Sequence, residues 1–98
     1  MARRALRRDR KLQELGELLR TWRKIHRLPM SVVAERAGIT RDTLRAIETD
    51  PASVRFENVF AVLEVLGIDQ YLMGALDPAT TDRGRAMLER GLPERVRL

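Results

Sequence analysis

Apolar residues recur at steps of three and four through most of the chain, which is the spacing of helices that bury one face. The first stripe predicts a helix over about residues 12–27, and no breaker stops it from extending upstream through Ala5 and Leu6. Pro29 should end this helix, because proline biases the residue before it away from helical angles. Trp22 lies on the stripe and is interpreted as a core residue. The stripe consists of Leu12, Leu15, Leu18, Leu19, Trp22 and Ile25.

Two shorter helices joined by a tight turn are predicted next. Proline is welcome at the first position of a helix, so the second helix begins at Pro29 or Met30, and Gly38 suits its end. Thr40 is expected to cap a third helix over residues 41–49, since its side chain can accept a backbone N–H. The expected inward residues of the two helices are Val33, Ala34, Ala37, Leu44 and Ile47.

The second half of the chain predicts two further helices. A fourth helix starts at Phe56 and is closed by Gly67. Asp69 is expected to cap a fifth helix, which Asp77-Pro78 stops. The apolar positions of these helices are Phe56, Val59, Phe60, Val62, Leu63 and Leu66, then Tyr71, Leu72, Met73 and Leu76.

The end of the chain carries a weaker pattern. It is compatible with a helix around residues 82–90, a break at Gly91-Leu92-Pro93 and an extended end. The whole pattern predicts an all-α fold with a five-helix domain over residues 12–76. The basic residues 1–11 before it are either an arm or a continuation of the first helix, and residues 77–98 form a C-terminal extension.

Composition narrows the classes of protein. The chain has 98 residues, no Cys and one His, which excludes disulfide frameworks, zinc fingers, thiol nucleophiles and multi-histidine metal sites. Aromatic residues make up 4%, which disfavours an aromatic platform that stacks RNA bases. No apolar run reaches the roughly 18 residues of a membrane helix, and the first residues lack the apolar stretch of a secretory signal. We therefore expect a soluble cytoplasmic protein that uses no metal or cofactor.

Charge is unevenly distributed around a formal net value of +5. The first eleven residues hold six basic side chains and one acidic one, whereas residues 46–82 hold one basic and seven acidic side chains. Residues 83–98 are basic again, with five Arg and two Glu. A polyanion would be attracted to the start of the chain and repelled by its middle. An ordinary solvated surface explains the basic start equally well.

Residues 29–48 carry the most informative motif. Two short helices joined by a Gly-containing turn, with small Ala34 where they cross and Ile39 beneath the turn, meet the requirements of a helix-turn-helix. The stretch resembles the DNA-binding motif of the lambda-repressor-like (Cro/Xre-type) regulators, and the resemblance covers about residues 15–76. That family places its third helix in the major groove. By position, the resemblance implies DNA contacts from Thr40, Arg41, Asp42, Thr43 and Arg45.

Other positions either follow or depart from that family's pattern. The resemblance implies a structural ion pair between Arg23 and Glu48, which joins the first helix to the end of the third. Pro29 and Met30 stand where the family usually has a Ser or Thr cap followed by Gln, so a side-chain clamp on phosphate is missing. The basic start of the chain is a candidate replacement for it. His26, without a second His or Cys, is interpreted as a surface or phosphate-facing residue and not a metal ligand.

Segments of the second half resemble HipB-type antitoxins, the DNA-binding partners of HipA-like Ser/Thr kinase toxins. One departure is Arg55, where relatives usually have a Ser cap. The resemblance implies a homodimer that binds a palindromic operator in double-stranded DNA, represses its own operon and neutralises a kinase toxin. It leaves open whether the acidic middle or the C-terminal extension contacts the toxin or the second copy. The resembling segments are residues 48–54, 62–68, 75–78 and 92–97.

Two alternatives stay open, and two further classes are disfavoured. One alternative is a stand-alone Xre-type repressor without a toxin, and the other, raised by Pro29 and Met30, is an interaction module that no longer binds DNA. An enzyme is disfavoured because no set of nucleophile, base and orienting residue is visible. A membrane-surface helix is disfavoured because Asp9, Glu14 and Glu17 interrupt the basic start.

Overall fold

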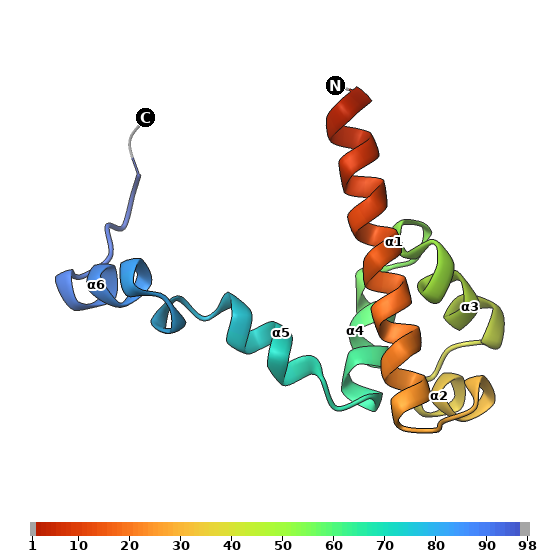
Figure 1. Cartoon of the computed structure of the whole chain (residues 1–98). Helices are drawn as coiled ribbons and strands as arrows, with labels where there is room; N and C mark the ends of the chain where they lie inside the picture. The colour runs from red at the N-terminus through yellow and green to blue at the C-terminus, as the bar shows by residue number, and fades with distance from the viewer. Residues whose placement is uncertain (1, 97–98) are drawn as a thin grey trace.

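The computed structural model describes residues 2–96, and all regular structure in this part of the chain is helical (Figure 1). This architecture confirms the predicted all-α fold and is consistent with a lambda-repressor-like domain. The α-helices are α1 (Ala2–Ile25), α2 (Met30–Ala37), α3 (Arg41–Thr49), α4 (Phe56–Val65), α5 (Asp69–Leu76) and α6 (Asp82–Arg90). Short 3₁₀ helices η1 (Pro51–Ser53) and η2 (Pro78–Thr80) precede α4 and α6.

The core lies where α1, α2, α3 and α4 meet. Val33, Leu44 and Ile47 are completely buried, and Ala34 is small where α2 packs closely in the bundle. Gly38 closes α2 with a left-handed φ of 71°, which a residue without Cβ adopts freely. The α2–turn–α3 unit is thus held by burial on one side and by a glycine turn at its centre. The remaining core residues are Leu19, Val59, Val62, Leu63, Leu66 and Ile68.

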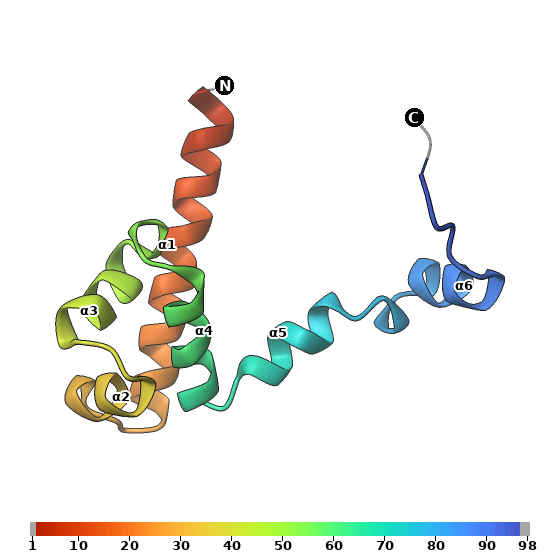
Figure 2. The same cartoon turned by 180° about the vertical axis from the view of Figure 1, so that it is seen from behind.

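The molecule has two projections from this bundle. Figures 1 and 2 show that the first half of α1 extends beyond the bundle, while α5 leads the chain away in another direction towards α6. We call residues 77–96 the C-terminal arm. Within the arm, α6 packs on η2, and the Thr81 hydroxyl caps α6 by accepting the Gly84 N–H at 3.0 Å. The arm is therefore ordered by its own contacts and does not return to the bundle.

α1 takes the predicted upstream extension at its start and differs from the prediction at its end. It begins at Ala2, well before residue 12, because the Arg-, Ala- and Leu-rich start favours helix and nothing interrupts it. It ends at Ile25 and not near residue 27, because Arg27 adopts a left-handed φ of 56°. The chain thus leaves the helix before Pro29 can clash with it. The last two residues of the predicted extended end, 97 and 98, lie outside the described residues.

Several apolar residues of the predicted fourth and fifth helices are exposed in the structure. Phe56 is 66% exposed, and Tyr71, Met73 and Leu76 on α5 are also exposed. These residues follow a helical spacing, but helical spacing alone does not say whether another element covers them. Trp22 is half-buried against the core, and its ring centroid lies 5.9 Å from that of Tyr71.

The start of α5 also differs from the prediction. Ile68 takes the N-cap position and no side chain caps the helix, so Asp69 is not its cap. Asp69 is instead the first helical residue, where its charge suits the helix dipole without a capping bond. Within residues 2–96 no single helix is long and apolar enough to cross a membrane; α4 and α5 pass that criterion only together, with a bend of 115° between them.

Gly16 sets the distance between α1 and α3. A Cβ at this position would lie 2.7 Å from the Glu48 carbonyl oxygen and 2.8 Å from that of Ile47. Gly16→Ala is therefore expected to displace α3 and lower the free energy of unfolding by about 1–3 kcal/mol, even though alanine favours helix. Gly74→Ala is the matched control, because a Cβ there meets nothing within 4 Å. Urea denaturation compares the two, and equal effects would contradict the close approach.

Candidate nucleic-acid interface

α3 has one apolar face and one charged face. Leu44 and Ile47 are fully buried, which fixes the helix against the bundle. Arg41, Asp42 and Arg45 are exposed, because they occupy the opposite side of the helix. The structure thus gathers two guanidinium groups and one carboxylate on the outer face of a short, rigidly held helix.

Two threonines shape the first turn of α3. The Thr40 side chain caps the helix by accepting the Thr43 N–H at 3.0 Å, as the sequence predicts. The Thr40 hydroxyl then donates to the Thr43 hydroxyl at 2.9 Å. Because the Thr43 oxygen acts here as an acceptor, its own O–H is left to donate to another group. The N-terminus of α3 therefore carries a fixed Thr40 and a half-buried Thr43 whose hydroxyl still has a proton to donate.

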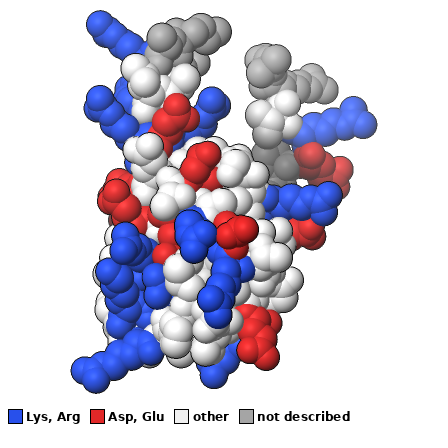
Figure 3. Space-filling model, turned by 90° about the vertical axis from the view of Figure 1, so that its right-hand side faces the viewer, with Lys and Arg blue, Asp and Glu red and all other residues white. Residues whose placement is uncertain are grey.

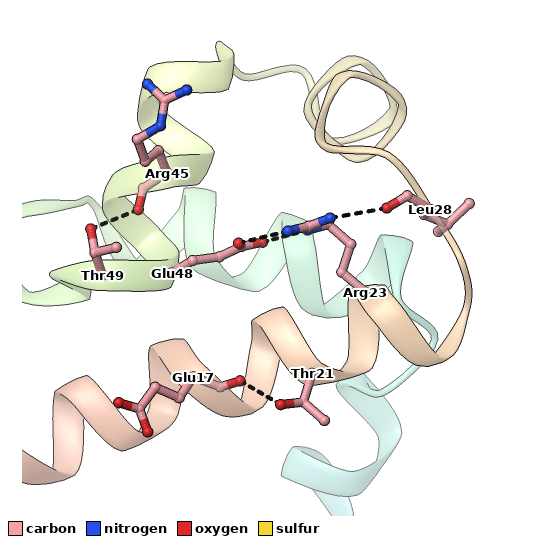
Figure 4. Close-up of polar contacts among 7 residues, drawn as sticks. All are labelled: Glu17, Thr21, Arg23, Leu28, Arg45, Glu48 and Thr49. Carbon is pink, nitrogen blue, oxygen red and sulfur yellow. Dashed lines mark hydrogen bonds and ion pairs between the residues drawn. The ribbon is translucent and has the colours of Figure 1, made fainter.

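Arg45 and Asp42 form an ion pair on the exposed face. Arg45 Nη1 lies 3.0 Å from Asp42 Oδ1, and the two side chains are 63% and 91% exposed. Pairs this exposed contribute little to stability, so Arg45 can exchange Asp42 for another acceptor at small cost. Figure 4 shows the Arg45 side chain pointing away from α1. Asp42 therefore orients the Arg45 side chain outward, in an ion pair that is weak enough to be exchanged for another contact.

Arg23 and Glu48 join α1 to the end of α3 (Figure 4). Arg23 Nε donates to Glu48 Oε2 at 2.8 Å and Nη2 donates to Oε1 at 3.1 Å, a two-pronged geometry. Arg23 Nη1 also donates to the Leu28 carbonyl at 3.1 Å, which anchors the loop before α2. The side chains are only 12% and 5% exposed. The pair therefore fixes α3 relative to α1 in a region that water hardly reaches.

Hollows flank α3 on two sides. One, of about 200 Å³, is lined by residues of α1, α2 and α3 and includes Arg20 beside Arg45 and Thr49. The other, of about 380 Å³, lies between α3 and the start of α4 and includes Arg55 and Asn58. Sequence reasoning missed Arg20. The signal for it was present, because Gly16, Arg20 and Arg23 repeat at steps of four and three and so share the α1 face that α3 crosses.

The face on which α3 lies is rich in positive charge. Figure 3 shows Lys and Arg side chains spread over this side of the molecule, with Asp and Glu between them. Lys and Arg side chains continue along the projecting half of α1. Arg3, Arg7 and Arg10 repeat there at steps of four and three and so share one face of the helix. A surface of this kind attracts a polyanion, although its scattered carboxylates weaken the positive electrostatic potential.

Comparison with known proteins agrees with this geometry. A family model described as helix-turn-helix matches residues 19–69, just over half of the chain, which span α2, α3 and α4. The chain belongs to this helix-turn-helix family. A helix-turn-helix (HTH)-type transcriptional regulator of Haemophilus influenzae is 33% identical over 57 residues, covering 58% of this chain and 56% of the relative. No solved structure matches the chain significantly.

Membership in the helix-turn-helix family confirms the Cro/Xre-type resemblance and supports the expectation of a regulator rather than an enzyme. The family match begins at Leu19 and ends at Asp69, so it includes Arg23, Glu48 and all five predicted DNA-contacting residues. It leaves out the first part of α1 and the C-terminal arm. These two projections are therefore the features that set this helix-turn-helix chain apart from the matched domain.

His26 has a structural contact that the sequence interpretation did not foresee. Its Nε2 lies 2.9 Å from the Leu66 carbonyl oxygen, which can only accept, so Nε2 donates. This bond ties the end of α1 to the end of α4. His26 is exposed, as its interpretation as a surface residue predicts, but its ring nitrogen is bound to a backbone acceptor forty residues along the chain.

The start of α2 shows the effect of the departure at Pro29 and Met30. Pro29 occupies the N-cap position and no side chain caps the helix. Met30 is half-buried and packs against the core, so it points inward and offers no polar group to a ligand. An anion at this end of the helix-turn-helix would meet free backbone N–H groups without a side-chain cap.

Proposed function

We propose that this chain is a sequence-specific DNA-binding transcriptional repressor, in which α3 enters the major groove. The observation that carries the proposal is the exposed Arg41–Asp42–Arg45 face on a capped helix whose other side is buried. A helix held this rigidly can present its side chains to base edges in a fixed orientation. The matching family and the regulator from Haemophilus influenzae support the same function.

The proposed contacts follow from the donor and acceptor groups of α3. Arg41 and Arg45 each carry a planar fork that can donate two hydrogen bonds to guanine O6 and N7. Thr40 and Thr43 can contact a phosphate or a thymine methyl group. Asp42 would be repelled by phosphate, so its role is to accept from a cytosine amino group or to orient Arg45, with which it pairs at 3.0 Å.

Phosphates on either side of the groove are the proposed partners of the flanking basic residues. The major groove is about 12 Å wide, so backbones lie on both sides of an inserted helix. Arg20 lies on one flank of α3 and Arg55 on the other. The projecting half of α1 adds Arg3, Arg7 and Arg10. These residues would replace the phosphate clamp that Pro29 and Met30 lack.

The proposal includes a homodimer on a palindromic operator. One α3 has nine residues and can reach only a few base pairs. Twofold symmetry doubles the length of the site and therefore the sequence information that is read. A dimer of this kind acts on chromosomal DNA, and its proposed compartment is therefore the cytoplasm.

We further propose that the chain is the antitoxin of a pair, with a HipA-like kinase as its toxin. The C-terminal arm favours this over a stand-alone Xre-type repressor, because it extends beyond the matched domain in the region that resembles HipB-type antitoxins. Co-expression with the product of the adjacent reading frame tests it. Co-purification with a kinase, and inhibition of that kinase's activity, is expected; a neighbour unrelated to kinases would favour the stand-alone repressor.

DNA binding itself is tested by gel shift and footprinting of the full chain on its own upstream region. A protected twofold-symmetric site is expected, with affinity that falls as salt rises. The triple variant Arg3→Gln, Arg7→Gln and Arg10→Gln keeps the helix but removes charge, and its salt slope should be shallower by roughly 0.9 for each phosphate that is no longer neutralised. Absence of any shift, with or without a partner kinase, would favour the interaction module that no longer binds DNA.

A further inference from the structure

An apolar groove runs between α1, α4 and α5 on the surface of the bundle. Its volume is about 230 Å³, and its lining is almost wholly apolar. Three lining residues, one from each helix, are more than half exposed: Leu18 is 51%, Phe56 66% and Tyr71 65% exposed. Trp22 and Leu63 lie deeper in the groove. A hollow of this composition gains free energy when another apolar surface excludes water from it.

The C-terminal arm is a preformed element with apolar residues of its own. The Asp77 carboxylate accepts the Ala79 N–H at 2.9 Å, and Arg85 Nη1 donates to the Ala79 carbonyl at 3.0 Å, so η2 and α6 are locked together. Apolar residues beside and within the arm are nevertheless exposed, namely Leu76, Leu88, Leu92 and Val96. Because α5 carries the arm away from the bundle, these residues do not reach the groove of their own chain (Figures 1 and 2).

The groove side and the later part of the arm, from Arg83 on, have opposite charge. Residues 56–76, which form α4 and α5, hold three acidic side chains and no basic one. Residues 83–96 of the arm hold four Arg and two Glu, whereas the start of the arm holds Asp77 and Asp82. The part of an arm from Arg83 on is therefore attracted to the α4–α5 side of another molecule, which favours one relative orientation. The acidic residues of the groove side are Glu57, Glu64 and Asp69, and the arginines of the arm are Arg83, Arg85, Arg90 and Arg95.

We propose that the groove binds the C-terminal arm of a second copy of this chain, so that two copies exchange arms about a twofold axis. The inference rests on the proposed homodimer and names the surface that forms it. Each chain supplies one groove and one arm, so a reciprocal exchange covers both grooves and closes the assembly at two. The exposed residues of the groove rim and of the arm then shield each other from water, and the arginines of the arm lie along the acidic side of its partner.

The first test is sedimentation equilibrium of the full chain and of three glutamine variants. The wild type is expected at twice the 11.3 kDa chain mass. Leu18→Gln and Phe56→Gln should each raise the dimer Kd at least about tenfold. Ile25→Gln is the control, because Ile25 is 59% exposed on the same helix as Leu18 but does not line the groove. A wild type that stays monomeric, or an Ile25→Gln effect equal to that of Leu18→Gln, would overturn the proposal.

The second test exchanges the charges between the two surfaces. Arg83 and Arg90 are seven residues apart on α6, and Glu57 and Glu64 are seven apart on α4, so each pair shares a helix face. Copies with Arg83→Glu and Arg90→Glu should be monomeric alone, as should copies with Glu57→Arg and Glu64→Arg. Their mixture should form a heterodimer, because both arm–groove contacts are then attractive. Two variants that dimerise alone as well as the wild type does would refute the arm exchange.

The operator gel shift separates this inference from the proposed function. If the wild type is dimeric and binds its operator while Leu18→Gln and Phe56→Gln remain dimeric, the surface is wrong and the dimeric repressor stands. If the wild type is monomeric yet binds DNA, the arm exchange fails and DNA binding by α3 survives. If the two groove variants lose both the dimer and tight operator binding, while Ile25→Gln loses neither, both proposals are supported.

Discussion

Replacing both Arg41 and Arg45 with alanine is expected to lower affinity for the operator at least about 30-fold, because each two-pronged contact with guanine is worth roughly 1–3 kcal/mol. Binding to a scrambled duplex should fall much less, since phosphate contacts from Arg20, Arg55 and the start of α1 remain. Fluorescence anisotropy with the two duplexes measures both affinities. The melting temperature should hardly change, because both arginines are exposed.

The control variant for this prediction keeps both positive charges and removes the two planar guanidinium groups. Arg41→Lys with Arg45→Lys retains two positive charges, but lysine is a point donor and cannot match the paired acceptors of guanine. This variant should bind the scrambled duplex as the wild type does, yet discriminate poorly between the two duplexes. If alanine substitution weakened both duplexes by the same factor, α3 would be a phosphate-binding helix and not the reading helix.

Glu48→Ala is expected to lower the free energy of unfolding by about 3–5 kcal/mol, because it leaves Arg23 charged and nearly buried without its partner. The side chain of Arg23 is only 12% exposed, so water cannot replace the missing carboxylate efficiently. For a domain of this size the melting temperature should fall by at least about 10 °C. Thermal unfolding followed by circular dichroism measures the change.

Glu57→Ala is the matched control for Glu48→Ala. Glu57 also pairs with an arginine, at 3.2 Å from Arg55, but its side chain is 71% exposed. Its removal should change stability by no more than about 0.5 kcal/mol. The double variant Arg23→Ala with Glu48→Ala should be less destabilised than the sum of the two single variants predicts, since no charge is left unpaired. Equal small shifts for Glu48→Ala and Glu57→Ala would contradict a structural role for the pair.

The elements set by local chemistry could be predicted from the sequence. Thr40 caps α3 and Gly38 closes α2, because capping and left-handed turns depend on the residue type and its immediate neighbours. Ala34 is buried where the helical period and the need for close packing coincide. Arg23 and Glu48 meet across 25 residues, and only the family resemblance brought that pair to attention.

The structural features that the sequence did not predict all depend on information that a local pattern lacks. Phe56 and Tyr71 are apolar at helical spacing, but period alone does not say whether another element covers a face. His26 bonds the Leu66 carbonyl just after α4, and no rule about neighbouring residues predicts a partner that distant. Asp69 is a suitable cap by type, yet the backbone places Ile68 there. The base contacts of α3 stay predictions, because DNA chemistry is inferred from donor groups and their exposure.

At Arg27 the steric cost of a left-handed backbone and the favourable effect of a positive charge act in opposite directions, and salt can separate them. A side chain at φ 56° costs about 1 kcal/mol that glycine would avoid, in part offset by glycine's greater freedom in the unfolded chain. The positive charge at the carbonyl end of α1, however, contributes about 0.3–1 kcal/mol at low ionic strength. Salt screens the charge but not the steric cost, so the difference in stability between arginine and glycine at this position depends on the ionic strength. The melting temperature of Arg27→Gly minus that of the wild type should therefore be more positive in concentrated salt than in dilute buffer.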